Sequence, residues 1–124
     1  MAKLLIAEDD ADLMEFLRTK LTQAGFAVTT ANNGADAVVL AVEGDVDLVL
    51  LDMLMPRLDG LQVSRLLRKL RPHLPILALT GYVGQGYMAE AAALGITCLA
   101  KPISSETLIR ELHEALQNAV KQGA

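Results

Sequence analysis

Carboxylate, hydroxyl and ammonium side chains directly follow several short apolar runs in this chain of 124 residues. Crowded carboxylates repel one another, and each raises the pKa of its neighbour unless a cation lies between them. Mg²⁺ is a hard cation that binds such oxygens together with water and phosphate oxygens. A carboxylate can also attack phosphorus, and hydroxyl and ammonium groups can hold the oxygens of the transferred group. The groups in question are Glu8, Asp9, Asp10, Asp52, Thr80 and Lys101.

Each of these groups alone is weak evidence, because loops after strands are often polar and solvated. The spacing of the apolar residues predicts the elements that would bring them together. Strands are expected at 3–7, 26–31, 48–51, 76–79 and 96–100. Helices are expected at 12–24, at 35–42, around 63–70, at 88–94 and after Ser104 or Ser105, with a frayed tail at 121–124.

The alternation of strands and helices predicts an α/β fold, a doubly wound five-stranded parallel sheet with five helices. Unbroken apolar runs such as Leu48–Leu51 suit strands that are buried on both faces. In such sheets the functional site lies at the carboxyl ends of the strands. All the groups named above follow strands at that edge, so their joint occurrence is much stronger evidence than any one of them. We expect a single domain over 1–124, with a core of about 3–120 and no output domain.

The composition excludes several classes of protein. The formal net charge is −4, which argues against binding to nucleic acid or to an anionic membrane surface. No apolar stretch is long enough to be a signal-peptide core or a membrane-spanning helix. A single cysteine, Cys98, leaves no intrachain disulfide. We therefore expect a cytoplasmic protein.

Four segments resemble the receiver domain of two-component response regulators. They are KLLIAEDD at the start, LVLLDMLMPRLDG in the middle, ILALTG in the fourth strand and LAKP in the fifth. The resemblance covers about 3–120 and implies the flavodoxin-like strand order 2-1-3-4-5. It also implies Mg²⁺ (or Mn²⁺) as the cofactor.

The resemblance assigns a role to each position. Asp52 resembles the phospho-acceptor, while Thr80 and Lys101 resemble the switch hydroxyl and the phosphate-binding lysine. Metal ligands would come from Asp9 directly, from Glu8 through water, from Asp52 and from the backbone carbonyl of Leu54, with Asp10 auxiliary. Pro102 would follow a cis peptide bond, which is often present in the family.

The sequence departs from the family at the position three residues before Lys101, where Cys98 replaces the usual aromatic side chain. Cysteine is a small hydrophobe with little volume to report a change at the site. One hypothesis is that Tyr82 acts as the mobile aromatic instead. Leu54 and Tyr82 would both flank the acceptor, and neither offers an acid or amide to position water. Slow loss of the phosphoryl group is therefore expected, slower than in a Leu54→Asn variant.

The resemblance implies a switch that catalyses only its own phosphorylation and dephosphorylation, and is not an enzyme acting on other substrates. Its donor would be a sensor histidine kinase or a histidine phosphotransfer protein, and its downstream protein target is unidentified. It would act as a free-standing regulator or as an excised receiver of a hybrid kinase or longer regulator, as a monomer or a phosphorylation-dependent dimer. A degenerate receiver that serves as a constitutive interaction module is the alternative. An aspartate-nucleophile phosphatase would need an acid at Leu54, and a flavodoxin-like carrier would need a phosphate-binding loop where this chain is acidic.

Overall fold

The computed structural model describes residues 1–53, 59–81 and 87–123, and strands alternate with helices along the chain. The strands are β1 (Lys3–Ala7), β2 (Ala27–Ala31), β3 (Leu48–Asp52), β4 (Ile76–Thr80) and β5 (Thr97–Ala100). The helices are α1 (Ala11–Gln23), α2 (Gly34–Glu43), α3 (Gly60–Leu70), α4 (Tyr87–Ala93) and α5 (Ser105–Gly123). The ten predicted elements are confirmed, and their ends agree with the prediction or shift by up to three residues.

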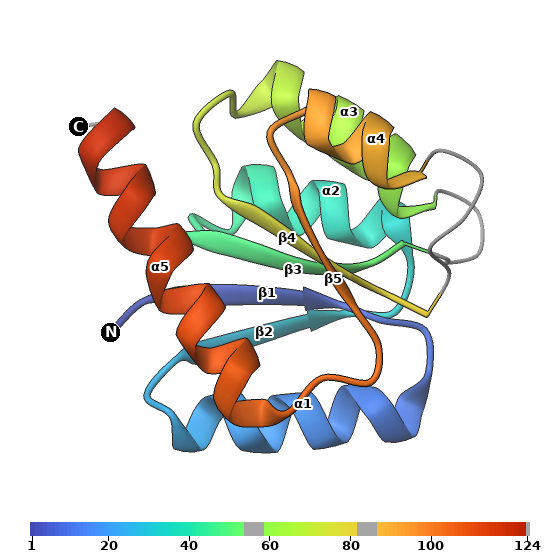
Figure 1. Cartoon of the computed structure of the whole chain (residues 1–124), viewed down its shortest axis with the longest axis vertical. Helices are drawn as coiled ribbons and strands as arrows, with labels where there is room; N and C mark the ends of the chain where they lie inside the picture. The colour runs from blue at the N-terminus through green and yellow to red at the C-terminus, as the bar shows by residue number, and fades with distance from the viewer. Residues whose placement is uncertain (54–58, 82–86, 124) are drawn as a thin grey trace.

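The strands form one parallel sheet in the order β2-β1-β3-β4-β5, which confirms the flavodoxin-like, doubly wound fold. Figure 1 shows α1 and α5 on one face of the sheet and α2, α3 and α4 on the other. Every residue of β3 and β4 is buried, as the unbroken apolar runs predicted. Because all strands are parallel, their carboxyl ends meet at one edge.

Two apolar layers fill the spaces between the sheet and its helices. On the α2, α3 and α4 face, Leu51, Val63 and Ala91 belong to one cluster of buried side chains. On the α1 and α5 face, Leu21 and Leu112 belong to the second cluster. Alternate residues of each strand point into the two layers. Both layers consist mainly of aliphatic side chains. Burying one such side chain contributes about 1.5–3 kcal/mol.

Local side-chain hydrogen bonds fix where the helices begin. Asp10, Asn33 and Asp59 each accept hydrogen bonds from backbone N–H groups in the first turn of α1, α2 and α3. Ser104 accepts from the backbone of Thr107, so it rather than Ser105 caps α5. Such caps satisfy N–H groups that have no partner within the helix.

The carboxyl end of the chain differs from the prediction. We expected a frayed tail from Lys121, but α5 continues to Gly123. No proline or glycine interrupts the sequence before Gly123, so the helical hydrogen bonds extend to that point. Within the described residues, no helix combines the length and hydropathy that crossing a membrane would need.

Candidate phosphoryl-acceptor site

Glu8 lies just beyond β1 with its carboxylate folded back over the chain that follows. Its Oε2 atom accepts hydrogen bonds from the backbone N–H of Asp9 at 3.0 Å and of Asp10 at 3.3 Å. The Glu8 backbone N–H donates to the Ala31 carbonyl at the end of β2, 3.0 Å away. Glu8 is only 3% exposed, although it is an acid. Hydrogen bonds around the junction between β1 and α1, and not contacts with solvent, therefore hold Glu8 in place.

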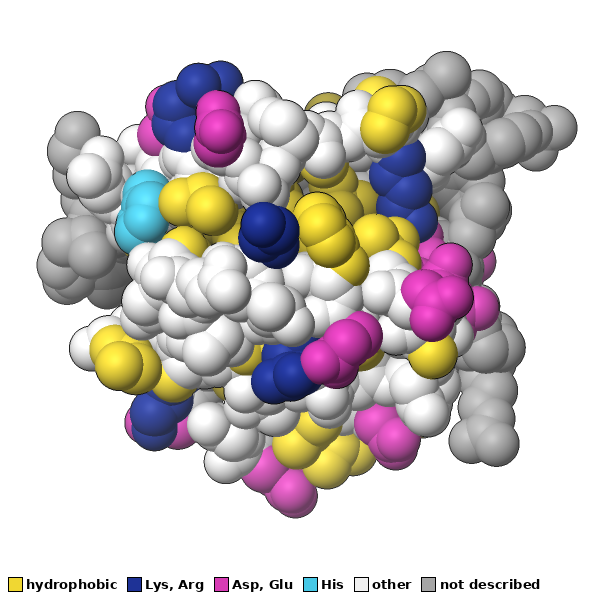
Figure 2. Space-filling model, turned by 90° about the horizontal axis from the view of Figure 1, so that it is seen from below, with side chains coloured by type: hydrophobic (Ala, Val, Ile, Leu, Met, Phe, Trp, Pro, Cys, Tyr) yellow, Lys and Arg dark blue, Asp and Glu magenta, His cyan; other side chains and the backbone are white. Residues whose placement is uncertain are grey.

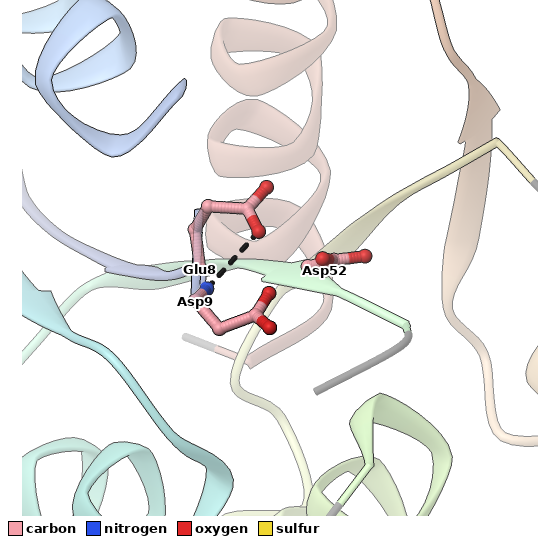
Figure 3. Close-up of side chains that lie close together, drawn as sticks. All are labelled: Glu8, Asp9 and Asp52. Carbon is pink, nitrogen blue, oxygen red and sulfur yellow. Dashed lines mark hydrogen bonds between the residues drawn. The ribbon is translucent and has the colours of Figure 1, made fainter. Parts of the chain in front are cut away.

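Asp52 is the last residue of β3, in the middle of the sheet, between β1 and β4. It is 8% exposed, and its strand partner in β4 is Leu79. Ligand oxygens of Glu8, Asp9 and Asp52 all lie within 4.8 Å of one another. Figure 3 shows the three carboxylates converging from β1 and β3, with the Glu8–Asp9 hydrogen bond dashed. Three oxygen donors of this kind could hold a hard divalent cation.

Burial and the nearby Asp52 disfavour the ionised form of Glu8. Burial, the hydrogen bond with the Asp52 side chain and the charge of Asp52 raise the pKa of Glu8 from its ordinary value of 4.5 to about 7. The Asp10 N–H and the Lys101 ammonium act in the opposite direction, but they do not cancel those effects. The donor set therefore fits a cation, since a bound divalent ion would favour the ionised form of these acids.

Lys101 reaches the same cluster from the end of β5. Its Nζ atom lies 3.4 Å from Oε1 of Glu8 and 3.7 Å from Oδ1 of Asp52. The Lys101 backbone N–H donates to the Thr80 carbonyl at 2.8 Å, which ties the end of β5 to the end of β4. Thr80 itself is 2% exposed. The Lys101–Pro102 peptide bond is cis. The structure thus brings together the sequence-derived groups Glu8, Asp9, Asp52, Thr80 and Lys101 at one edge of the sheet.

Other sequence-derived positions lie elsewhere or outside the described residues. Leu54 and Tyr82 belong to 54–58 and 82–86, so the structure describes neither the proposed carbonyl ligand nor the proposed mobile ring. Cys98 is half-buried and packs against the core cluster under α2, α3 and α4. Burial raises the pKa of its thiol.

Two positions near the site have structural roles that the sequence reasoning did not assign. Asp10 caps α1 with its side chain, at 3.0 Å from the Asp12 N–H and 3.1 Å from the Leu13 N–H. An acid immediately before an amphipathic stretch was the available signal. Gly60 begins α3 close to the end of β3, and its N–H donates to the Met53 carbonyl at 3.0 Å. No pattern in the sequence of 54–60 predicts that Gly60 lies so close to the backbone of Met53.

Replacing Gly60 by alanine should destabilise the protein, because the new Cβ would lie 2.7 Å from the Asp52 carbonyl oxygen and 2.7 Å from Met53 Cα. Both neighbours are backbone atoms that cannot turn away. We expect a loss of about 1–3 kcal/mol in the free energy of unfolding, measured by urea denaturation. Gly81→Ala is the control, since a Cβ there meets no atom of the described residues within 4 Å. Equal losses in the two variants would contradict this explanation.

Comparisons with known proteins agree with the fold and identify a family. Residues 4–113 match the family described as response regulator receiver domain. The transcriptional regulatory protein CusR of Escherichia coli K12 is 36% identical over 116 residues, which cover 93% of this chain and 51% of CusR. The response regulator receiver protein CpdR of Brucella abortus is 33% identical, covering 94% of this chain and 98% of CpdR.

A solved structure of a receiver-containing relative has a similar fold. The response regulator protein TrrA of Thermotoga maritima, solved in complex with Mg²⁺-BeF, is 28% identical. The TM-score is 0.84, and the match covers 93% of this chain and 99% of that chain. The chain spans about half the length of CusR, so activities of that whole regulator are not carried over. The family match and these likenesses place the chain in the response regulator receiver domain family.

Proposed function

We propose that this receiver domain accepts a phosphoryl group on Asp52 from a phosphohistidine donor in a reaction that depends on Mg²⁺ or Mn²⁺. The observation that carries the proposal is the arrangement at the carboxyl edge of the sheet. Three carboxylates have oxygens within 4.8 Å of one another, and one ammonium group lies within 4 Å of two of them. Phosphoryl transfer needs mainly positioning and charge neutralisation, and this edge can supply both.

Asp52 would be the nucleophile. One of its carboxylate oxygens forms a bond to phosphorus while the phosphorus–nitrogen bond of the donor histidine breaks. The electron pair of that bond leaves with the imidazole. Asp52 is 8% exposed, which limits the access of bulk water to its carboxylate. This supports a covalent state that lasts long enough to signal.

Glu8, Asp9 and Asp52 would hold the metal ion, and the Leu54 carbonyl, outside the described residues, completes the proposed set. The bound cation would neutralise charge on the phosphoryl oxygens and on the acids. The relative TrrA was solved with Mg²⁺-BeF, which supports the same cofactor in this chain. Lys101 would move from its pairing with Glu8 and Asp52 to a phosphoryl oxygen, and the Thr80 hydroxyl would donate to another.

A protein donor suits the surface next to Lys101. A mostly apolar cavity of about 230 Å³ lies there between α1, β4 and the segment that joins β5 to α5. Phe16 on α1 lines it and is 50% exposed. Figure 2 shows hydrophobic side chains gathered among charged ones on the face seen from below Figure 1. We propose a sensor histidine kinase or a histidine phosphotransfer protein as the donor that docks here, and the cytoplasm as the compartment in which the transfer takes place.

The chain would act as one receiver domain that changes its binding to a downstream protein when Asp52 is phosphorylated. Thr80 and Pro102 border the site, and Cys98 lies in the strand that leads to Lys101. With cysteine at that position, the readout would use another side chain, for which Tyr82 is our hypothesis.

The test is incubation with acetyl phosphate, with and without Mg²⁺, followed by intact mass measurement. The proposal predicts a gain of one phosphoryl group with Mg²⁺ and no gain with a chelator such as EDTA. The Mg²⁺-dependent binding of beryllofluoride provides a second readout that involves no covalent step. Labelling that proceeds equally with EDTA would overturn the metal-dependent mechanism. A protein that binds neither reagent would be a degenerate receiver.

A further inference from the structure

The three consecutive acids after β1 do not occupy equivalent positions. Glu8 is buried, whereas Asp9 and Asp10 are exposed. Oxygens of Glu8 and Asp9 join Asp52 in the cluster that could hold a cation, and Asp10 is not part of that cluster. The Asp10 side chain instead turns toward α1, where its Oδ1 accepts from the N–H groups of Asp12 and Leu13. A carboxylate used in this way is directed at the helix and not at a metal.

The backbone of Asp10 is held from the other side. Its N–H donates to Oε2 of Glu8 at 3.3 Å, beside the 3.0 Å bond from the Asp9 N–H to the same oxygen. Its carbonyl accepts from the Met14 N–H at 2.9 Å. Asp10 thus joins the Glu8 carboxylate to the first turn of α1. Asp9 lies between Glu8 and Asp10 in the chain. Its side chain is exposed, and its backbone is held on both sides by these two residues.

We propose that Asp10 is a positioning residue for the metal site, and that it acts through its hydrogen bonds and not through its charge. Capping fixes the backbone that presents the Asp9 carboxylate and that holds Oε2 of Glu8. Groups that orient metal ligands without touching the ion commonly change metal affinity by about 10–100-fold when they are removed. This inference rests on the metal site proposed above.

Substitutions at Asp10 separate a hydrogen-bonding role from a charge role. Asn and Ser retain a side-chain oxygen that caps a helix about as well as Asp does, but neither carries a charge. Ala has no acceptor. We therefore expect Asp10→Asn and Asp10→Ser to keep the affinity for Mn²⁺ within about threefold of the unmodified protein, and Asp10→Ala to lose about tenfold.

The affinity is measured by the electron paramagnetic resonance signal of free Mn²⁺ during titration of folded protein, which involves no phosphoryl transfer. Asn33→Ala is the matched control, because Asn33 caps α2, the next helix along the chain, by a 2.9 Å bond from the Asp36 N–H and is absent from the acid cluster. That variant should lose stability but keep its Mn²⁺ affinity. If Asp10→Ala does not fold, Asp10→Gly replaces it, since glycine lacks the acceptor yet is tolerated at a helix N-cap.

Tenfold loss in Asp10→Ala with rescue by Asn and Ser supports the inference. Equal losses in all three variants would show that the charge of Asp10 matters, and would overturn it. Unchanged affinity in folded Asp10→Ala would show a role in helix stability alone, and would also overturn it. If the unmodified protein binds no Mn²⁺, the proposed metal site fails and the inference fails with it.

Discussion

Replacing Lys101 by methionine should slow phosphoryl acceptance by about 10²–10³-fold, the usual cost of losing one group that stabilises transition-state charge. The Lys101 ammonium is 3.4 Å from Glu8 and 3.7 Å from Asp52, so it is close to the oxygens that would carry the incoming charge. Methionine retains most of the apolar stem but has no charge. The rate is measured as the gain of phosphoryl mass with acetyl phosphate at saturating Mg²⁺.

A matched change tests whether the effect belongs to this lysine. Lys69 is exposed near the end of α3, away from the acid cluster. Lys69→Met removes the same charge and should accept the phosphoryl group at the rate of the unmodified protein. If Lys101→Met is slowed less than tenfold, or if both variants are slowed alike, Lys101 does not have the proposed role.

Stability without metal should fall as the pH rises, because Glu8 has a raised pKa. The group titrates near 4.5 when unfolded and near 7 when folded. Between these values the folded protein binds more protons than the unfolded chain, so the free energy of unfolding decreases with rising pH. The contribution is fully present below pH 4.5 and is lost by about pH 7, with a total of about 3 kcal/mol.

The measurement is urea denaturation in EDTA from pH 4.5 to 8, compared with the variant Glu8→Gln. The glutamine cannot ionise, so this component of the pH dependence should disappear. Glu43→Gln at the exposed end of α2 should retain the profile of the unmodified protein. Mg²⁺ bound at the proposed site should reduce the fall above pH 6, since the cation favours the ionised acid. A profile that is the same for the unmodified protein and for Glu8→Gln would contradict the explanation.

Apolar spacing was enough to predict the sheet and the edge that bears the acids. Leu48–Leu51 is an unbroken aliphatic run, and it forms the fully buried central strand β3 that ends at Asp52. The parallel arrangement then places Glu8 and Asp52 at the same edge without any knowledge of side-chain contacts. The strand order itself came from the family resemblance, because periodicity does not determine which strands are neighbours.

Contacts between residues distant in the chain were beyond sequence reasoning. Apolar spacing predicted a helix around 63–70, yet two of its leucines, Leu66 and Leu70, are 39% and 54% exposed, since the helix presents another face to the core. Arg68 on the same helix donates to the carbonyls of Leu74 and Leu94, each at 2.6 Å. Such a bond depends on how α3 packs against α4. Apolar periodicity contains no information about that packing.

The central claim is that Asp52 is the phospho-acceptor, and intact mass tests it most directly. The unmodified protein, Asp52→Asn and Asp12→Asn are incubated with acetyl phosphate and Mg²⁺, Asp12 being an exposed acid in the first turn of α1. The unmodified protein and Asp12→Asn should each gain one phosphoryl group, and Asp52→Asn should gain none. A phosphoryl group that is still taken up by folded Asp52→Asn would contradict the claim.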